Sequence, residues 1–139
     1  MFPLLSLLFP FIDLRNQFHI DHVYPISRFT RARLQKLGFD DERIETSARH
    51  ANELPNLQLL EGPINNEKRA AMPAEWLAQH LSDPAAQLHY RTKHELGELP
   101  TDLNGFEAFH SARRERLRAK LIALLCAGPT LVEQSATAA

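Results

Sequence analysis

The sequence contains one cysteine, Cys126, among 139 residues. A single cysteine cannot form an internal disulfide, and its sparing use suits the reducing cytoplasm. Cys126 falls in the apolar run 121–127, where we expect a buried thiol. The sequence therefore excludes the disulfide-stapled class of small secreted domains.

The sequence also has no apolar run long enough to cross a bilayer as a helix. Its most apolar stretch is residues 1–12, MFPLLSLLFPFI, which two prolines interrupt. This stretch is too short for a membrane span, and it has neither the positive region nor the cleavage site of a signal peptide. We expect it to pack onto the fold as a core segment, or to have been covered by an upstream domain of a longer protein.

The sequence also lacks an excess of basic residues. It has 16 Lys and Arg against 17 Asp and Glu, which gives a net charge of −1. This balance gives no sign of nucleic-acid binding and argues against a colicin-type toxin nuclease, which would be basic. Nine basic residues nevertheless gather in two stretches that could contact phosphates, although such stretches are more often solvated. They are Arg28, Arg31, Arg33, Lys36 and Arg113, Arg114, Arg116, Arg118, Lys120.

The composition present, 44% hydrophobic and 24% charged, is that of a folded globular protein. The length suits one domain over 1–139, with a core at about 9–81, a closing helix at about 104–127 and a flexible tail at 128–139. Tyr24 and Trp76 are expected in the core.

Hydrophobic periodicity and turn residues predict an α+β fold that is mostly helical, with one small strand pair. Ser27 should cap a helix that Gly38 ends. A downstream helix contains Pro73, which should kink or split it. The predicted elements are a strand at 18–23, helices at about 28–37 and 41–52, a strand at 56–61, a turn at 62–63, and helices at about 65–81 and 104–127.

The order strand, long insertion, strand, turn, helix should bring the end of the first strand beside the start of the following helix. Asp21 and His22 lie at that strand end, and Asn65 opens that helix. A carboxylate and an amide oxygen suit Mg²⁺, and a histidine that titrates near neutral pH suits a general base. Taken singly, each residue is more often a surface pair or a cap.

A closed zinc site is not indicated. The chain has one cysteine and seven histidines without the paired spacing of metal ligands. Accordingly no chemistry is predicted for five of those histidines, at positions 50, 80, 89, 94 and 110.

Two stretches, FHIDHVYPIS and LPNLQLLEGPINNEKRAAMPAEWL, together resemble the signature of HNH (ββα-metal) endonucleases. The resemblance is closest to the C-terminal HNH domain of GmrSD-type restriction and phage-defence proteins. It runs from about residue 9 to 125 and includes the ending FEAFHSARRERLRAKLIALL. The implied fold is a two-stranded hairpin and a helix, with added helices in the insertion and at the C-terminus.

The resemblance implies a role for each matching residue in a DNA endonuclease that uses Mg²⁺, Mn²⁺ or another divalent cation. Asp21 would be a metal ligand and His22 the general base. Asn56 would brace the loop that orients the base. Asn65 would be the second metal ligand, and Lys68 would steady the scissile phosphate.

The sequence leaves open which asparagine is the second metal ligand and what directs the protein to its target. Asn66 is also an asparagine and rivals Asn65 as the ligand, although the spacing from Asn56 favours Asn65. The family's upstream NTP-sensing or DNA-sensing domain has no counterpart here, so a separate sensor domain or subunit is an expected partner. The alternative function is a non-cutting module that binds DNA or docks on a partner protein.

Overall fold

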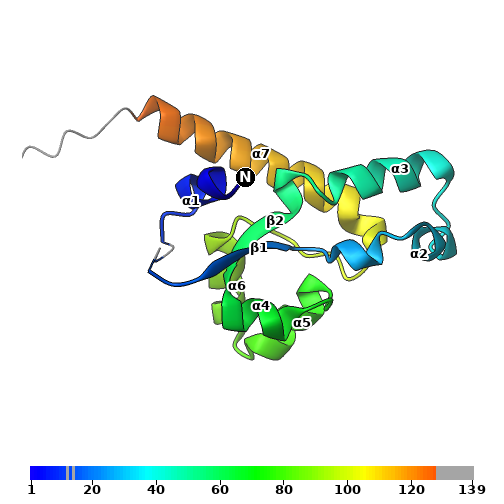
Figure 1. The fold of residues 1–139 in the computed structure, drawn as a ribbon, viewed down its shortest axis with the longest axis horizontal. Coiled ribbons are helices and arrows are strands. Elements are labelled where there is room, and N and C mark those ends of the chain that lie inside the picture. Colours follow the sequence, from blue (N-terminus) through cyan, green and yellow to red (C-terminus); the bar gives the residue numbers. More distant parts are fainter. Residues whose placement is uncertain (12, 14, 128–139) are drawn as a thin grey trace, which may run out of the picture.

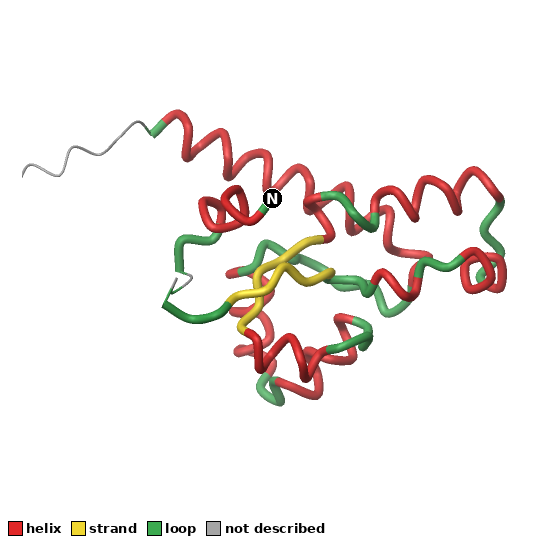
Figure 2. Tube along the Cα trace, in the orientation of Figure 1, coloured by secondary structure: helices red, strands yellow, loops and turns green. Residues whose placement is uncertain are grey.

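The computed structural model describes residues 1–11, 13 and 15–127. In this part of the chain, helices surround a two-stranded antiparallel hairpin, which gives the α+β, mostly helical fold that the sequence predicts (Figures 1 and 2). The elements are α1 (Phe2–Leu8), β1 (Phe18–His22), η1 (Ile26–Arg28), α2 (Arg31–Lys36), α3 (Asp41–His50), η2 (Leu54–Asn56), β2 (Leu57–Glu61), α4 (Gly62–Lys68), α5 (Pro73–His80), α6 (Pro84–Lys93), η3 (Leu103–Gly105) and α7 (Phe106–Cys126).

The hairpin lies at the centre of the molecule. In its register Asp21 is opposite Gln58 and His22 is opposite Leu57. Figure 1 shows α1 and α7 on one side of the hairpin and α4 with α5 on the other. Because helices cover β2 on both faces, its residues 57–60 are all buried, and the strand reads as LQLL rather than as an alternating pattern.

The apolar N-terminus packs onto the fold, which confirms the expectation of a core segment. Leu5, Leu8 and Phe9 are fully buried and form one cluster with Leu59 of β2 and Leu117 of α7. At about 25 cal/mol per Å² of buried apolar surface, such side chains each contribute about 1.5–3 kcal/mol. Removal of α1 would therefore expose one face of the hairpin.

An aromatic cluster forms the second core, between the loop after β1 and the start of α7. The Tyr24 ring packs edge-on to Phe106 and Phe109, with centroids 5.5 and 4.9 Å apart. Its hydroxyl donates to the Pro100 carbonyl at 2.9 Å. The prediction that Tyr24 and Trp76 belong to the core is confirmed, since their side chains are 0% and 6% exposed.

The helix expected at 28–37 begins later than predicted. Ser27 lies inside the short helix η1, and Thr30, in extended conformation, is the N-cap of α2. Phe29 is buried against Phe106, with ring centroids 4.6 Å apart, and this packing interrupts the helix. Gly38 has a φ of +83°, a conformation that favours glycine, and its amide closes the end of α2 as predicted.

The segment expected as a turn and one helix is two helices. Gly62 and Pro63 form the first turn of α4, where proline is tolerated because that amide has no intrahelical partner, so the predicted turn is wrong. The predicted split near Pro73 is confirmed, since α4 ends at Lys68 and α5 begins at Pro73. Residues 84–93, where no element was predicted, form α6, capped by the Asp83 carboxylate.

Helix α7 closes the domain, as the sequence predicts, and its final residues extend past the other elements (Figure 1). Phe106, Phe109 and Leu117 face inward, whereas Leu125 is 71% exposed. Cys126 is exposed too, so the expected buried thiol is wrong. The predicted flexible tail at 128–139 lies outside the described residues.

None of the described helices combines the length and the apolar character that a bilayer-spanning helix requires.

Candidate functional site

The Asp21 carboxylate near the end of β1 is the centre of the first site. Its Oδ2 atom lies 2.8 Å from Lys68 Nζ, which comes from the last turn of α4. The amide of Gln58, opposite on β2, donates to the same oxygen at 3.1 Å. Within the described residues Oδ1 makes no hydrogen bond, so one carboxylate oxygen is fixed and the other is free.

Lys68 is buried, with 1% of its side chain exposed. Its ammonium also donates to the His22 carbonyl at 2.7 Å. Burial lowers the pKa of Lys68, and the neighbouring Asp21 carboxylate opposes that shift. The expected contact of Lys68 with a scissile phosphate is not what the structure shows, because α4 packs against β1 and directs the ammonium inward.

The His22 imidazole is partly exposed beside this ion pair. Its Nε2 lies 3.3 Å from the Asn52 Oδ1, and Asn52 in turn donates to the Ala48 carbonyl at 3.4 Å. When Nε2–H donates to Asn52, Nδ1 carries the lone pair, and it has no partner among the described residues. In that tautomer, His22 has a free nitrogen of the kind that a general base needs.

Asn56 joins the loop after β1 to the end of α3. It is 0% exposed. Its Oδ1 accepts from the Tyr24 amide at 2.9 Å, and its Nδ2 donates to the carbonyls of Tyr24 and Ala51 at 3.0 and 2.8 Å. These bonds hold in place the two backbone segments that carry His22 and Asn52.

Asn65 lies one helical turn before Lys68 on α4. Residues three apart on a helix share a face, so Asn65 is on the face that α4 turns toward β1. Asn65 is half-buried and Asn66 is exposed. Neither side chain makes a hydrogen bond within residues 15–127. The oxygens of Asp21 and Asn65 fit Mg²⁺ in kind, although the Lys68 charge opposes a second cation.

Much of the second basic stretch points inward. Arg113 is 0% exposed and donates to the carbonyls of Pro55, Leu57 and His94 at 2.8, 2.9 and 3.2 Å. Arg116 donates to the Glu95 and Leu96 carbonyls. The prediction that this stretch could contact phosphates is therefore wrong for Arg113, whose guanidinium links η2 and β2 to the loop after α6.

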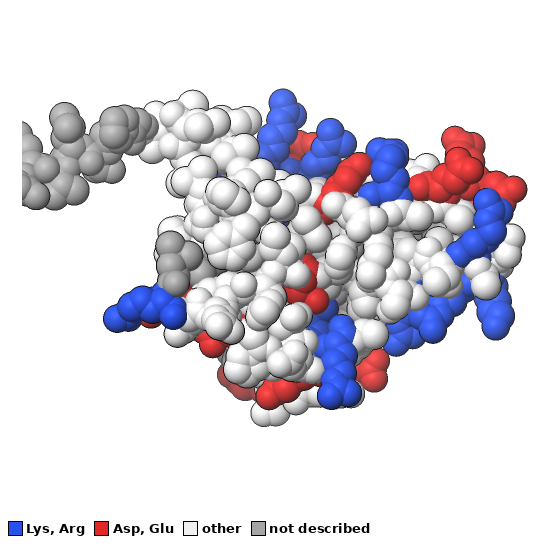
Figure 3. Space-filling model, viewed as in Figure 1, with Lys and Arg blue, Asp and Glu red and all other residues white. Residues whose placement is uncertain are grey.

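Three of the four basic residues of the first stretch also have partners within the protein. Arg28 donates to the Ala70 carbonyl, Arg33 to the Ser27 carbonyl, and Arg31 pairs with Asp41. In the view of Figure 3, positive and negative side chains alternate along the edge formed by α7 and α3. This face is of mixed sign, as the near-zero net charge suggests.

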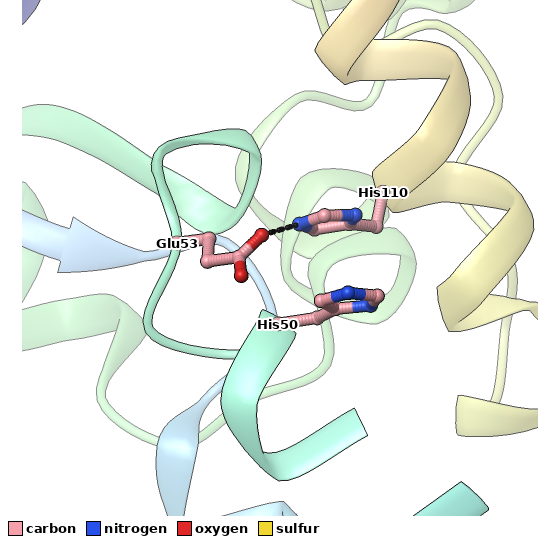
Figure 4. A group of neighbouring side chains, drawn as sticks. All are labelled: His50, Glu53 and His110. Atoms are coloured by element: carbon pink, nitrogen blue, oxygen red, sulfur yellow. Dashed lines mark ion pairs between the residues drawn. The ribbon is translucent and has the colours of Figure 1, made fainter. Parts of the chain in front are cut away.

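A second group of side chains, His50, Glu53 and His110, lies at the junction of α3, η2 and α7 (Figure 4). Their candidate ligand atoms are all within 4.8 Å of one another. The two imidazole rings stack with centroids 4.2 Å apart, and His110 Nε2 is 3.2 Å from Glu53 Oε2. Both histidines belong to the set for which the sequence predicted no chemistry.

Sequence spacing could not reveal this group, because His50 and His110 are far apart in the chain and meet only when α7 packs on α3. The one local signal is the His-x-x-Glu spacing of His50 and Glu53 at a helix end. Burial, followed by the nearby His50, lowers the pKa of His110, which keeps its ring neutral at pH 7. A neutral imidazole is the form that binds metals.

Comparison with protein-family models gave no match to this chain, and comparison with curated proteins gave none either. The interpretation of function therefore rests on the two clusters themselves.

Proposed function

We propose that the protein is a metal-dependent endonuclease that hydrolyses DNA phosphodiester bonds at Asp21 and His22. The observation that supports this most directly is the state of Asp21. One of its oxygens is held by Lys68 at 2.8 Å and Gln58 at 3.1 Å, and the other is free, next in sequence to a histidine with an unpartnered nitrogen. A carboxylate fixed in this way is preorganised to receive a cation.

The residues supply the parts of a hydrolytic step. His22 Nδ1 accepts a proton from water as the water oxygen forms a bond to phosphorus. The bond from phosphorus to the leaving sugar oxygen breaks, its electron pair stays on that oxygen, and a solvent proton neutralises it. A Mg²⁺ or Mn²⁺ ion held by Asp21 and Asn65 would supply compensation for the negative charge of the phosphate.

Lys68 and Asn56 act as positioning residues in this scheme. Lys68 fixes one oxygen of the Asp21 carboxylate, rather than touching the phosphate. Asn56 holds the backbone on either side of His22 and Asn52 through its three hydrogen bonds. Both residues would thus act on the reaction through the geometry of Asp21 and His22.

The biological setting of this proposal comes from the HNH resemblance. A nuclease of the GmrSD type would serve prokaryotic restriction or phage defence, and a sensor or NTPase domain or subunit would direct it. Arg113, Arg116 and Arg28 are engaged by backbone carbonyls of the protein itself. These internal contacts support an arrangement in which another domain or chain provides part of the DNA affinity.

A plasmid-nicking assay tests the proposal. The purified chain should convert supercoiled DNA to the nicked form with Mg²⁺ or Mn²⁺ and not with EDTA. His22→Ala should abolish nicking while the circular dichroism spectrum stays unchanged. His89→Ala, at an exposed histidine of α6, is the matched control and should nick like the parent. Equal nicking by His22→Ala and the parent would refute the mechanism.

A non-cutting binding module is the second candidate, and the Asp21–Lys68 ion pair favours it. A buried ammonium already neutralises the carboxylate, so a divalent cation would have to bind beside it. Under this alternative the chain binds DNA with a salt-dependent affinity but cuts it with no divalent metal. Gel-shift measurements over a range of salt, run beside the nicking assay, separate the two functions.

A further inference from the structure

The group formed by His50, Glu53 and His110 has the construction of a metal site, independently of the proposed nuclease. Three separate elements contribute to it: His50 ends α3, Glu53 precedes η2, and His110 lies on α7. Figure 4 shows the Glu53 carboxylate directed at His110, above the stacked ring of His50. Two imidazoles and one carboxylate form a ligand set that suits Zn²⁺.

His50 is oriented by a carboxylate on its outer side. Its Nδ1 lies 2.7 Å from Glu107 Oε2, and the other oxygen of Glu107 accepts from Ser47 Oγ at 2.9 Å. This arrangement leaves His50 Nε2 free to bind a cation. A carboxylate that fixes the tautomer and rotation of a ligand histidine is a regular feature of zinc sites.

His110 gives the second, independent indication. Its side chain is only 3% exposed, yet its Nε2 atom makes no hydrogen bond. This nitrogen faces Glu53 Oε2 at 3.2 Å without the geometry of a hydrogen bond. A buried polar atom without a partner costs free energy, and a cation between the two groups would satisfy both.

We propose that His50 Nε2, Glu53 Oε2 and His110 Nε2 bind one Zn²⁺ ion that links α3 to α7. A fourth coordination position would remain for water. His50 and Glu53 line a cleft of about 460 Å³, so the ion is reachable from solvent on that side. Mg²⁺ is a poor competitor for this site, because it prefers oxygen ligands in an octahedral arrangement.

Binding requires a small change in the rings. They are parallel to within 5° and 4.2 Å apart, and an ion cannot lie in both ring planes at once. With Zn–N distances of about 2.1 Å, tetrahedral ligand atoms are about 3.4 Å apart. The candidate ligand atoms lie within 4.8 Å of one another, so they must move closer, and one ring must tilt as they do. The imidazole proton resonances of His50 and His110 should therefore shift together on zinc addition.

The test uses the whole chain, free of any histidine tag and stripped of metal with EDTA. Calorimetric titration with Zn²⁺ should show one ion per chain, and an excess of Mg²⁺ should not displace it. Glu53→Gln and His110→Gln should each weaken binding at least about tenfold. His89→Gln, at an exposed histidine without a role in either site, should bind like the parent.

Two further results separate this proposal from the others. Zn²⁺ should raise the thermal midpoint of the parent chain by more than that of Glu53→Gln. The Glu53 side chain is partly exposed, so this variant keeps the test available even if His110→Gln fails to fold. Parental zinc affinity in Glu53→Gln would overturn the proposal. Loss of zinc binding in Asp21→Asn would overturn it as well, because the ion would then sit at the proposed nuclease site.

Discussion

Lys68 Nζ lies 2.8 Å from Asp21 Oδ2, in a position where only 1% of the lysine side chain is exposed. The pair joins the last turn of α4 to the end of β1, and it determines how the Asp21 carboxylate is presented. Its geometry is the basis for the first prediction.

Lys68→Met should destabilise the protein by about 3 kcal/mol, because it leaves a largely buried carboxylate without its counter-ion. Mg²⁺ should restore part of this loss, since the cation can take the place of the ammonium beside Asp21. Urea unfolding with and without Mg²⁺ measures both effects. The Lys68→Met, Asp21→Asn double variant is the control and should show no rescue. If Mg²⁺ stabilised the single and the double variant equally, the ion would bind at a site other than Asp21.

Asn65→Ala should lower the affinity for Mg²⁺ and the rate of nicking at least about tenfold, as expected for a lost ligand or an outer partner of one. Asn66→Ala, at the exposed neighbouring position, should leave both nearly unchanged. Nicking rates over a Mg²⁺ titration compare the two variants. If Asn66→Ala lost more Mg²⁺ affinity and nicking rate than Asn65→Ala, Asn66 would be the ligand.

Asn56→Ala should cost about 2–4 kcal/mol of stability, because the Tyr24 amide and the Ala51 carbonyl lose a partner where water cannot replace it. Asn52→Ala, at an exposed position, should change stability by less than about 0.5 kcal/mol. The latter variant should still nick more slowly, since His22 Nε2 loses its acceptor at 3.3 Å. Chemical denaturation and nicking are measured on both variants. Together they distinguish the structural role of Asn56 from the role of Asn52 in orienting the His22 imidazole.

Arg113→Met should destabilise the fold by about 3–5 kcal/mol, because it removes a buried charge that three carbonyl oxygens solvate. Arg114→Met changes the next, exposed residue of the same helix and should cost less than about 0.5 kcal/mol. Thermal unfolding of the two variants is the measurement. A similar midpoint for both would show that Arg113 contributes only packing.

The protein should lose stability as the pH falls from about 6.5 toward 3. Burial, aided by the Arg113, Lys93 and Lys120 charges, lowers the pKa of His94 to about 3. In that range the unfolded chain binds a proton that the folded chain does not, so unfolding becomes easier by up to about 1.4 kcal/mol per pH unit. His94→Phe should flatten the slope measured by urea unfolding at several pH values. His89→Phe should keep it.

Local signals in the sequence predicted most of the elements. Gly38 marked the end of α2, and Pro73 marked the break between α4 and α5. The prediction failed where a tertiary contact overrode the local pattern. Phe29 broke the expected helix to reach the aromatic core, and Cys126 lost its burial because α7 continues past the body of the protein.

The sequence placed the candidate nuclease residues on their elements but did not predict their contacts. Adjacent residues such as Asp21 and His22, and residues one helical turn apart such as Asn65 and Lys68, follow from strand and helix geometry. The direction of a long flexible side chain does not, so the burial of Lys68 against Asp21 became visible only in the packed structure.

The sequence by itself determined the strand pair, most of the helices and the placing of Asp21 and His22 together at a strand end, since these depend on neighbours in the chain. Only the tertiary structure decided that Lys68 and Arg113 turn inward and that His50 and His110 stack 4.2 Å apart. The physical reason is that contacts between distant segments depend on how α4 and α7 pack, and the spacing of residues along one segment carries no record of that packing.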